Sequence, residues 1–499
     1  MDSFSGFGPL DARSILLGLV VFLVLYRFLR RAPLNLPPGP TGWPVLGYLP
    51  QLATARDDPH VVFSKLAARY GDIISVNLAG TLVVVLHGYH TIKEAFNLHQ
   101  LSARPTLYVS ERLRPGVGII ASSGEIWTEI RRFSLTVLRG FGVGKSSFEE
   151  NIATEAKFLI EEWQKEDGSP FDPKHLISSA VSNVICSVVF GERFQYTDDN
   201  LQRLLQYSDD ILDQVGAGGA IEFSSFLSKL TFLPSIRRYV ATARRFNEQI
   251  DLMVRAHAVD YDADSLRDLI DTFLKQKEVK ESTAGGESKV FTGNNLKKVV
   301  GDLFMAGSET TTTTLRWSLL YMMTYPEVQS RVQKELDDVT RRNRFPRMSD
   351  RPDLPYTEAV ICELQRISTI VPLAVPHCST EDITFQGYTI PKGAIVLSNL
   401  WHDHFDPAVW EEPEAFRPER FRDKDGKLIS REELTVFGIG RRICLGEHLA
   451  RMELFIFFTL LLHEFTFKNP PDAPPVSLQA INGGTWAPLS FKVCAVPRA

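Results

Sequence analysis

Apolar residues recur at helical spacing through most of this chain and alternate with polar residues in only a few short segments. Long amphipathic stretches cover Phe148–Trp163 and Leu201–Val215, and a longer helical pattern runs from Asn294 to Tyr325, where Pro326 ends it. The short β-rich segments lie early and late in the chain, at Ile73–Leu78, Leu82–Leu86, Asp382–Ile390 and Ala394–Ser398. The pattern therefore predicts a mostly α fold with a small β-sheet region segregated from the helices.

The N-terminus carries an unbroken apolar run from Ile15 to Tyr26, followed by Arg27, Arg30 and Arg31. The run is short for a full membrane span, but its positive charges follow it, and this order disfavours a cleaved signal peptide. We therefore expect residues 1–31 to form an N-terminal membrane-anchor helix that leaves the rest of the chain in the cytosol. Residues 32–50 are rich in proline and predict a stiff hinge, and residues 51–499 form the globular body.

The composition narrows the class of protein. With 499 residues, of which 44% are hydrophobic, the chain is long enough for a large core. Its net charge of −5 argues against nucleic acid as the main partner. The five cysteines are odd in number, widely spaced and free of CxxC pairs, so a disulfide framework or a structural zinc site is not expected.

The segment Phe437–Gly446 places one cysteine among three glycines and two arginines, directly before an apolar helical pattern. A thiolate can bind a metal only while it stays deprotonated, and a helix N-terminus lowers the pKa of a cysteine. The glycines allow the backbone to approach a flat cofactor, and Arg442 could form a forked pair with a cofactor carboxylate. The alternative is that Cys444 is a small buried hydrophobe in a glycine turn. The combination of aromatic, glycines and arginine favours the thiolate interpretation.

A second segment with candidate chemistry, Ala306–Thr311, lies inside the long helical pattern. Gly307 and consecutive threonines are unfavourable in the middle of a helix. Threonine hydroxyls can bond to the carbonyl four residues earlier and bend the helix, and a bend could open a groove for dioxygen and a water molecule. The alternative is a threonine-rich helix face packed in the core.

The Phe437–Gly446 segment resembles the haem-binding loop of the cytochrome P450 family, and the resemblance extends over essentially the whole chain. It implies the cytochrome P450 fold and a heme b cofactor, iron protoporphyrin IX, with the Cys444 thiolate as the axial ligand of the iron. Residues 51–499 would then be the haem-thiolate catalytic domain. The resemblance also assigns proton delivery to bound dioxygen to Glu309 as the acid and Thr310 as the alcohol.

The resemblance further implies which residues bind the two haem propionates. Trp127 and Arg131 match the Trp-x-x-x-Arg element of the family, and Arg104, His377 and Arg442 stand where relatives place propionate ligands. Two alternatives stay open, because Arg104 could cap a loop and His377 could be a core histidine.

A structural motif supports the same family. Glu363 and Arg366 match its Glu-x-x-Arg helix, and Arg420 in a later segment is the third member of the expected ion-pair trio. The role of this trio is to hold the core together, not to catalyse.

The motifs resemble most the animal microsomal family 2 and its arthropod relatives, and two of them, Ile370–Leu373 and His404–Asp406, resemble the vitamin D 25-hydroxylase branch. By analogy, the residues expected to line the substrate pocket are mostly apolar: Ile119–Ser122, Asp302, Met305, Ala306, Val371, Ala374, Val375 and Gly484–Trp486. Small residues at Ala306, Ala374 and Gly484 suggest room near the iron. A steroid or secosteroid, a fatty acid, a sesquiterpenoid and a xenobiotic all stay open as substrates.

The expected function is a membrane-bound haem-thiolate monooxygenase that inserts one oxygen atom from dioxygen into an apolar lipid-like or xenobiotic molecule. Electrons would come from NADPH-cytochrome P450 reductase, with cytochrome b5 as a further candidate donor, at the cytosolic side of the endoplasmic reticulum membrane. Arg132, Arg139 and Arg441 are candidate docking residues for the reductase. The alternatives are a lipid peroxide isomerase or dehydratase on the same scaffold and a non-catalytic haem sensor. The Glu309–Thr310 pair favours the oxygenase, because neither alternative needs proton delivery to dioxygen.

Overall fold

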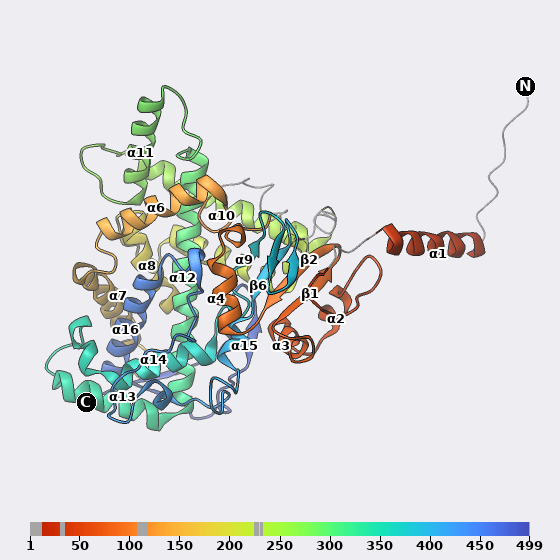
Figure 1. Ribbon diagram of the computed structural model, residues 1–499. Coiled ribbons are helices and arrows are strands. Elements are labelled where there is room, and N and C mark those ends of the chain that lie inside the picture. Colours follow the sequence, from red (N-terminus) through yellow and green to blue (C-terminus); the bar gives the residue numbers. More distant parts are fainter. Residues whose placement is uncertain (1–11, 30–34, 107–117, 224–228, 230–232, 499) are drawn as a thin grey trace, which may run out of the picture.

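The computed structural model describes residues 12–29, 35–106, 118–223, 229 and 233–498. Most of the chain forms a large helical region, and the small sheet β1–β2–β6 lies at one side of it (Figure 1). The helices in the described residues are α1 (Ala12–Leu29), α2 (Leu49–Thr54), α3 (Pro59–Tyr70), α4 (Tyr89–Asn97), α6 (Gly124–Gly140), α7 (Ser146–Gln164), α8 (Lys174–Val189), α9 (Asp199–Phe223), α10 (Pro234–Ala258), α11 (Leu269–Ala284), α12 (Gly293–Thr324), α13 (Pro326–Thr340), α14 (Pro355–Ser368), α15 (Leu400–His404) and α16 (Glu447–Glu464). This confirms a mostly α fold with a segregated sheet.

The main sheet joins strands from the two ends of the chain, in the order β1–β2–β6–β3. β1 (Ile73–Leu78) and β2 (Thr81–Leu86) are antiparallel, β6 (Ile395–Ser398) is parallel to β2, and β3 (His377–Cys378) is antiparallel to β6. Three two-stranded sheets complete the fold: β4 (Ile383–Phe385) with β5 (Tyr388–Ile390), β7 (Phe465–Lys468) with β10 (Cys494–Pro497), and β8 (Ala480–Asn482) with β9 (Trp486–Pro488).

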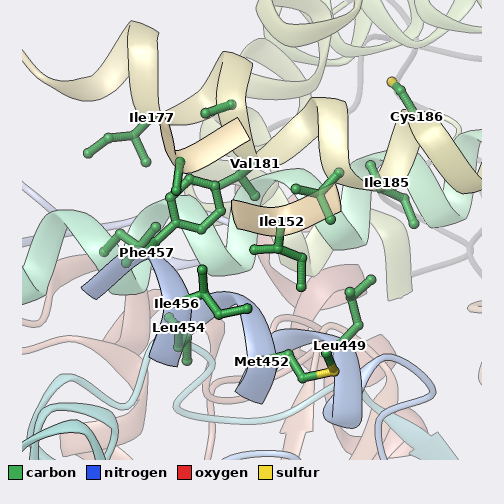
Figure 2. Packing of buried hydrophobic residues seen from close by; sticks show 14 of the residues in the cluster. Ile152, Ile177, Val181, Ile185, Cys186, Leu449, Met452, Leu454, Ile456 and Phe457 are labelled. Atoms are coloured by element: carbon green, nitrogen blue, oxygen red, sulfur yellow. The ribbon is translucent and has the colours of Figure 1, made fainter. Parts of the chain in front are cut away.

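The main core lies where α7, α8, α12 and α16 pack together. Ile152 of α7, Val181 of α8 and Ile456 of α16 are at most 1% exposed, and Figure 2 shows their side chains pointing toward one another. Full burial of one side chain of this size stabilises the fold by about 1.5 to 3 kcal/mol. This core supports the segment that begins with Cys444, because α16 starts three residues after the cysteine, at Glu447.

α12 runs through the centre of the helical region without a break. Its first turn is capped by the hydroxyl of Thr292, which accepts a hydrogen bond from the N–H of Asn295, and Pro326 follows its end and starts α13. The helix is therefore continuous through Ala306–Thr311, and the expected bend does not interrupt it. Gly307 has another reason to be small: a Cβ there would stand 3.2 Å from Ile185 of α8. The glycine permits the close approach of two helices.

The expected hinge packs against the sheet where it is described. The carbonyl of Pro38 accepts a hydrogen bond from the N–H of Ser75, and the hydroxyl of Ser75 donates to the carbonyl of Pro37. A Cβ at Gly39 would overlap the carbonyl oxygen of Ser75, so only glycine allows this contact. The segment thus adds to the edge of β1.

The predicted N-terminal helix forms as α1 and stands apart from the body in Figure 1. Many of its apolar side chains are exposed, such as Leu17 and Phe22. In the part of the chain that the structure describes, no helix combines the length and the apolar content that crossing a membrane would take. Residues 1–11 and 30–34, which include both ends of the expected anchor and the start of the expected hinge, lie outside the described residues.

Candidate functional site

The loop that carries Cys444 is closed by its own backbone. The N–H of Cys444 donates to the carbonyl of Phe437 at 2.9 Å, so the two ends of the loop lie side by side. Gly438 and Gly440 both have a φ of 78°, a conformation that side chains disfavour, and a Cβ at Gly440 would also collide with the carbonyl of Phe96. Gly446 has an ordinary φ of −92°, so conformation does not require a glycine there. Two of the three glycines are therefore needed for the shape of the loop.

The side chain of Cys444 is exposed, whereas the following helix soon becomes buried. Desolvation by surrounding protein raises the pKa of its thiol, and the N–H of Gly446 and the charge of Arg131 oppose that rise. The start of α16 thus lowers the pKa of the thiol as expected, through the N–H of Gly446, but desolvation outweighs it. A bound metal ion would stabilise the thiolate directly.

α12 presents its central turn to the same region. Ala306 is exposed although it lies in the middle of a largely buried helix, and Thr310 is half-buried one turn later. The hydroxyl of Thr310 donates to the carbonyl of Ala306 at 2.9 Å, as the sequence predicts. An exposed alanine inside a largely buried helix indicates that open space lies against this turn of α12.

One cavity joins the two motifs. It is lined by Thr310 and Thr314 of α12, by Phe437 of the cysteine loop and by Ala450 and Leu454 of α16. The loop around Cys444 and the central turn of α12, which lie far apart in the sequence, therefore border one space.

Glu309 is held on the side of α12 toward the hairpin β8–β9. Its Oε1 accepts hydrogen bonds from the hydroxyls of Thr313 and Thr485, each at 2.9 Å. Desolvation raises the pKa of Glu309, with Asp209 adding to the rise and the two hydroxyls opposing it. The sequence gave no sign that Thr485 contacts Glu309, because the two residues are 176 positions apart.

Three arginines gather beside the cysteine loop without a carboxylate partner. Within the described residues, no ion pair joins Arg104, Arg131 or Arg442 to an acid, although other arginines of the chain are paired. Desolvation, and then repulsion from the neighbouring arginines, lowers the pKa of both Arg104 and Arg442 to about 9. Such an uncompensated cluster is the arrangement expected around an anionic cofactor.

Trp127 completes this cluster. The guanidinium of Arg442 stacks on its ring at 3.8 Å, and its buried Nε1 has no hydrogen-bond partner in the described part of the chain. An indole N–H left unpaired in the interior is costly unless a ligand accepts its hydrogen bond. The tryptophan and the arginines therefore fit the carboxylates of a haem.

The arginines are oriented by backbone carbonyls. Arg442 donates through Nε to Ser102 and through Nη2 to Ser122, and Arg131 donates through Nη2 to Ile443. Arg104 donates through Nε to Ile120 and through Nη1 to Val375 and Pro376. Its Nη2 makes no bond within the described residues and is free to reach a ligand.

His377 lies near these arginines, but its ring contacts Leu101 and Phe96. Its Nδ1–H donates to the carbonyl of Leu101 at 2.6 Å, and its ring stacks on Phe96 with centroids 3.8 Å apart. Burial and the charge of Arg104 lower its pKa to about 3, so the ring is neutral and its Nε2 carries no proton. The bond to Leu101 and the stacking on Phe96 fit the core-histidine alternative, and the assignment of His377 to the propionates stays a prediction.

The expected ion-pair trio is present in the core. Glu363 accepts from Nε of Arg366 at 2.7 Å and from Nε of Arg420 at 3.0 Å, and neither Glu363 nor Arg366 is exposed to solvent. Arg366 also donates to the carbonyl of His404, which ties α14 to the end of α15. His404 is therefore a structural residue.

Two residues expected to line the substrate pocket have other roles. Asp302 is 4% exposed, and its Oδ2 accepts from the N–H groups of Ile119 and Ile120, so it holds a loop against α12. A Cβ at Gly484 would stand 2.3 Å from the side chain of Leu212, so no open space lies there. Asp302 is therefore not a free substrate anchor, and Gly484 does not indicate room near the iron.

One further group could hold a metal ion by geometry. His257, Asp268 and Asp271 bring their ligand atoms together, and no other such group occurs in the described ranges. Arg267 donates to Asp271 at 2.7 Å and neutralises the cluster together with His257, which marks it as an ion-pair junction between α10 and α11.

Comparisons with known proteins agree with these features. The family model "Cytochrome P450" matches residues 37–495. The chain is 41% identical to "Cytochrome P450 2J2" of Homo sapiens over 491 residues, which cover 97% of this chain and 96% of that protein. It is 37% identical to "Cytochrome P450 2U1" of Homo sapiens over 97% of this chain and 93% of that protein. It is 41% identical to "Cytochrome P450 2D14" of Bos taurus over 98% of each.

Proposed function

This chain belongs to the cytochrome P450 family, within its family 2, and from that premise we propose that it is a haem-thiolate monooxygenase of apolar lipid-like or xenobiotic molecules. The monooxygenase class and the haem cofactor follow from the family itself. The roles of individual residues, the substrate and the partner are the proposal. The observation that carries it is the cavity lined by Phe437 of the Cys444 loop and by Thr310.

Cys444 is the proposed ligand of the iron. When bound, a thiolate-ligated haem supplies the redox chemistry that activates dioxygen and inserts one of its atoms into the substrate. The exposed thiol, the loop closed from Cys444 to Phe437 and the two left-handed glycines support this assignment.

Trp127, Arg104, Arg131 and Arg442 are the proposed partners of the haem propionates. Their unpaired donors and uncompensated charge support this role. His377 is a further candidate, whose Nδ1–H already donates to the carbonyl of Leu101, so that only its Nε2 is left for a propionate.

Removing one of these cations is expected to loosen haem binding. Arg442→Ala should speed the transfer of haem to apomyoglobin by about tenfold or more, because a hydrogen bond to a charged group contributes roughly 1.5 to 3 kcal/mol. Arg441→Ala is the matched control, since Arg441 is the exposed neighbour on the same short helix turn, Gly440–Arg442. Equal rates for both variants would remove Arg442 from the proposed set.

Glu309 and Thr310 are the proposed acid and alcohol of proton delivery. Thr310 borders the cavity, and Glu309 precedes it on α12 with its carboxylate fixed by two hydroxyls. Burial raises the pKa of Glu309, so its carboxyl keeps a proton to higher pH than an exposed glutamate does, a shift in the direction that general acid chemistry needs.

The substrate is proposed to be apolar. Ile370 lines the cavity, and Met305, Val371 and Ala374, which are expected to line the substrate pocket, are half-buried. They offer contact surface and few polar anchors. The likeness to the vitamin D 25-hydroxylase branch stays a prediction, and His404 does not argue for it, because its ring bonds to Thr369 and Thr435 in the core.

NADPH-cytochrome P450 reductase is the proposed electron donor, at the cytosolic face of the endoplasmic reticulum. Arg132 and Arg139 are exposed on one side of α6, and Arg441 is exposed on the cysteine loop. α6 contacts that loop through Arg131, which donates to Ile443. A basic surface beside the haem-binding loop would suit an acidic electron donor.

The test of this function is Thr310→Ala in the enzyme reconstituted with the reductase. With a fatty acid, a steroid, a sesquiterpenoid and a drug-like probe assayed in parallel, the wild type should consume NADPH and yield an oxygenated product from at least one of them. Thr310→Ala should oxidise NADPH but lose about tenfold or more of the product per NADPH to hydrogen peroxide, the range of a lost proton-transfer group. Thr314→Ala, whose hydroxyl also bonds to the carbonyl four residues earlier, is the control. Turnover without NADPH and reductase, or full coupling in Thr310→Ala, would contradict the proposal.

A further inference from the structure

The turn between β8 and β9 brings a hydroxyl to the carboxylate on α12. We propose that Thr485 is a positioning residue for Glu309: its hydroxyl, together with that of Thr313, fixes one oxygen of the carboxylate and leaves the other free. This inference rests on the proposed function, in which Glu309 is the acid of proton delivery.

The contacts define the position of the carboxylate. Thr485 is 6% exposed and donates to Oε1 of Glu309 at 2.9 Å. Thr313, one turn after Glu309 on α12, donates to the same oxygen at 2.9 Å, and the two hydroxyls are 3.5 Å apart. Oε2 of Glu309 has no partner within the described residues. Two donors on one oxygen select one orientation of the side chain and keep the second oxygen available for a proton.

The hairpin that carries Thr485 is held from three sides. The N–H of Gly484 donates to the carbonyl of Leu212 on α9 at 2.8 Å, and the N–H of Trp486 donates to the carbonyl of Ile370 at 2.7 Å. From α12, the indole of Trp317 donates to the carbonyl of Trp486 at 2.9 Å. The turn therefore presents the hydroxyl of Thr485 at a fixed place, and it links the orientation of Glu309 to α9.

Charged groups from each neighbouring element also act on Glu309. Asp209 of α9 disfavours its charged form, and Lys174 of α8, which pairs with Asp209 at 2.5 Å, favours it. Arg316, two turns further along α12, is attracted by the charge of Glu309. The hydroxyl of Thr485 stabilises the charged form by donating to it, so its removal raises the pKa of Glu309 further.

An infrared titration of the haem-loaded enzyme tests the role of Thr485 without relying on turnover. The band of the protonated carboxyl of Glu309 is identified by its loss in Glu309→Gln, which separates it from that of the buried acid Glu453, whose pKa is about 8. Thr485→Val should raise the midpoint of the Glu309 band by about one pH unit. Thr485→Ser, which restores the hydroxyl, should return it to the wild-type value.

Thr312→Val is the matched control, because Thr312 is equally buried on α12 and its hydroxyl has no partner in the described residues. Its midpoint should equal that of the wild type. Thr485→Ala covers the case in which valine disturbs the hairpin, and it should give the same shift as Thr485→Val. An unchanged midpoint in Thr485→Ala would overturn the proposal, as would an equal shift in Thr312→Val.

A second measurement separates this role from that of Glu309. The hydrogen peroxide released per NADPH oxidised should rise in Thr485→Ala, and the same change in the Glu309→Gln background should add nothing. An additive effect in that background would contradict a role through Glu309. If Glu309→Gln itself releases no more peroxide than the wild type, the proposed function of Glu309 fails, whereas the infrared shift still decides whether Thr485 holds the carboxylate.

Discussion

Glu363→Gln is expected to lower the free energy of unfolding by about 3 to 5 kcal/mol, the cost of breaking a buried ion pair on one side. The glutamine keeps the shape of the side chain but removes the charge that Arg366 and Arg420 share. Arg366 has no exposed surface, so its cation would stay in the core with only neutral acceptors, the amide oxygen of the new glutamine and backbone carbonyls. Since a protein of this kind is stable by only about 5 to 15 kcal/mol, the yield of folded, haem-loaded protein should fall sharply.

The matched control is an ion pair at the surface. Lys65 and Asp57 are 2.5 Å apart, and their side chains are 66% and 45% exposed. Lys65→Met should therefore change the stability by about 1 kcal/mol or less. Denaturant unfolding followed by tryptophan fluorescence measures both variants. A loss in Glu363→Gln no larger than that in Lys65→Met would show that the trio does not stabilise the core.

Cys444→Ser is expected to abolish oxygen insertion while leaving the fold in place. The side chain of Cys444 is exposed and packs against no core cluster, so its replacement by the slightly smaller serine removes little buried surface. A serine hydroxyl does not stay deprotonated as a thiolate does, so it cannot supply the electron density that a thiolate gives the iron. Product formation should fall below detection, with the far-UV circular dichroism unchanged.

Cys378→Ser is the control for Cys444→Ser. Cys378 is half-buried on β3, where its thiol donates to the carbonyl of Ser379. Its desolvated thiol has a raised pKa and is inert, so serine at this position should keep product formation within about twofold of the wild type. A loss of activity in Cys378→Ser as large as that in Cys444→Ser would mean that the effect is not specific to Cys444.

Local patterns in the sequence predict the parts of the fold that depend on neighbours along the chain. The apolar period predicts α12 within one residue at each end, because Thr292 caps its start and Pro326 follows its end. The same holds for β1, which matches its predicted range. The end of α9 is less well predicted, since the amphipathic stretch ends at Val215 whereas the helix continues to Phe223.

In the candidate site, too, local sequence predicts some features, whereas distant residues decide others. The loop at Cys444 and the bond from Thr310 to Ala306 follow from residues a few positions apart, and both form as expected. The partner of Glu309 could not be predicted, because Thr485 reaches it only through the packing of a distant hairpin. Asp302 is a second example. The family resemblance suggested a substrate contact for it, but its carboxylate accepts hydrogen bonds from Ile119 and Ile120 in a distant loop.

Glycines and cations were also open to more than one interpretation. Gly484 indicated space and Gly307 a bend in the helix, whereas the structure packs Leu212 against the first and Ile185 against the second. By contrast, the grouping of Arg104, Arg131 and Arg442 near Trp127 is a long-range result that the family resemblance anticipated and the apolar pattern did not. Whether a small or charged residue serves packing or chemistry is decided by what the fold brings to it.

The most direct test of the account is the absorption spectrum of the reduced enzyme under carbon monoxide, recorded for the wild type and for Cys444→Ser at equal haem content. The account predicts that the wild type shows the strongly red-shifted Soret band of a thiolate-ligated haem and that Cys444→Ser lacks it. A Cys444→Ser protein that keeps this band would contradict the assignment of Cys444 as the iron ligand.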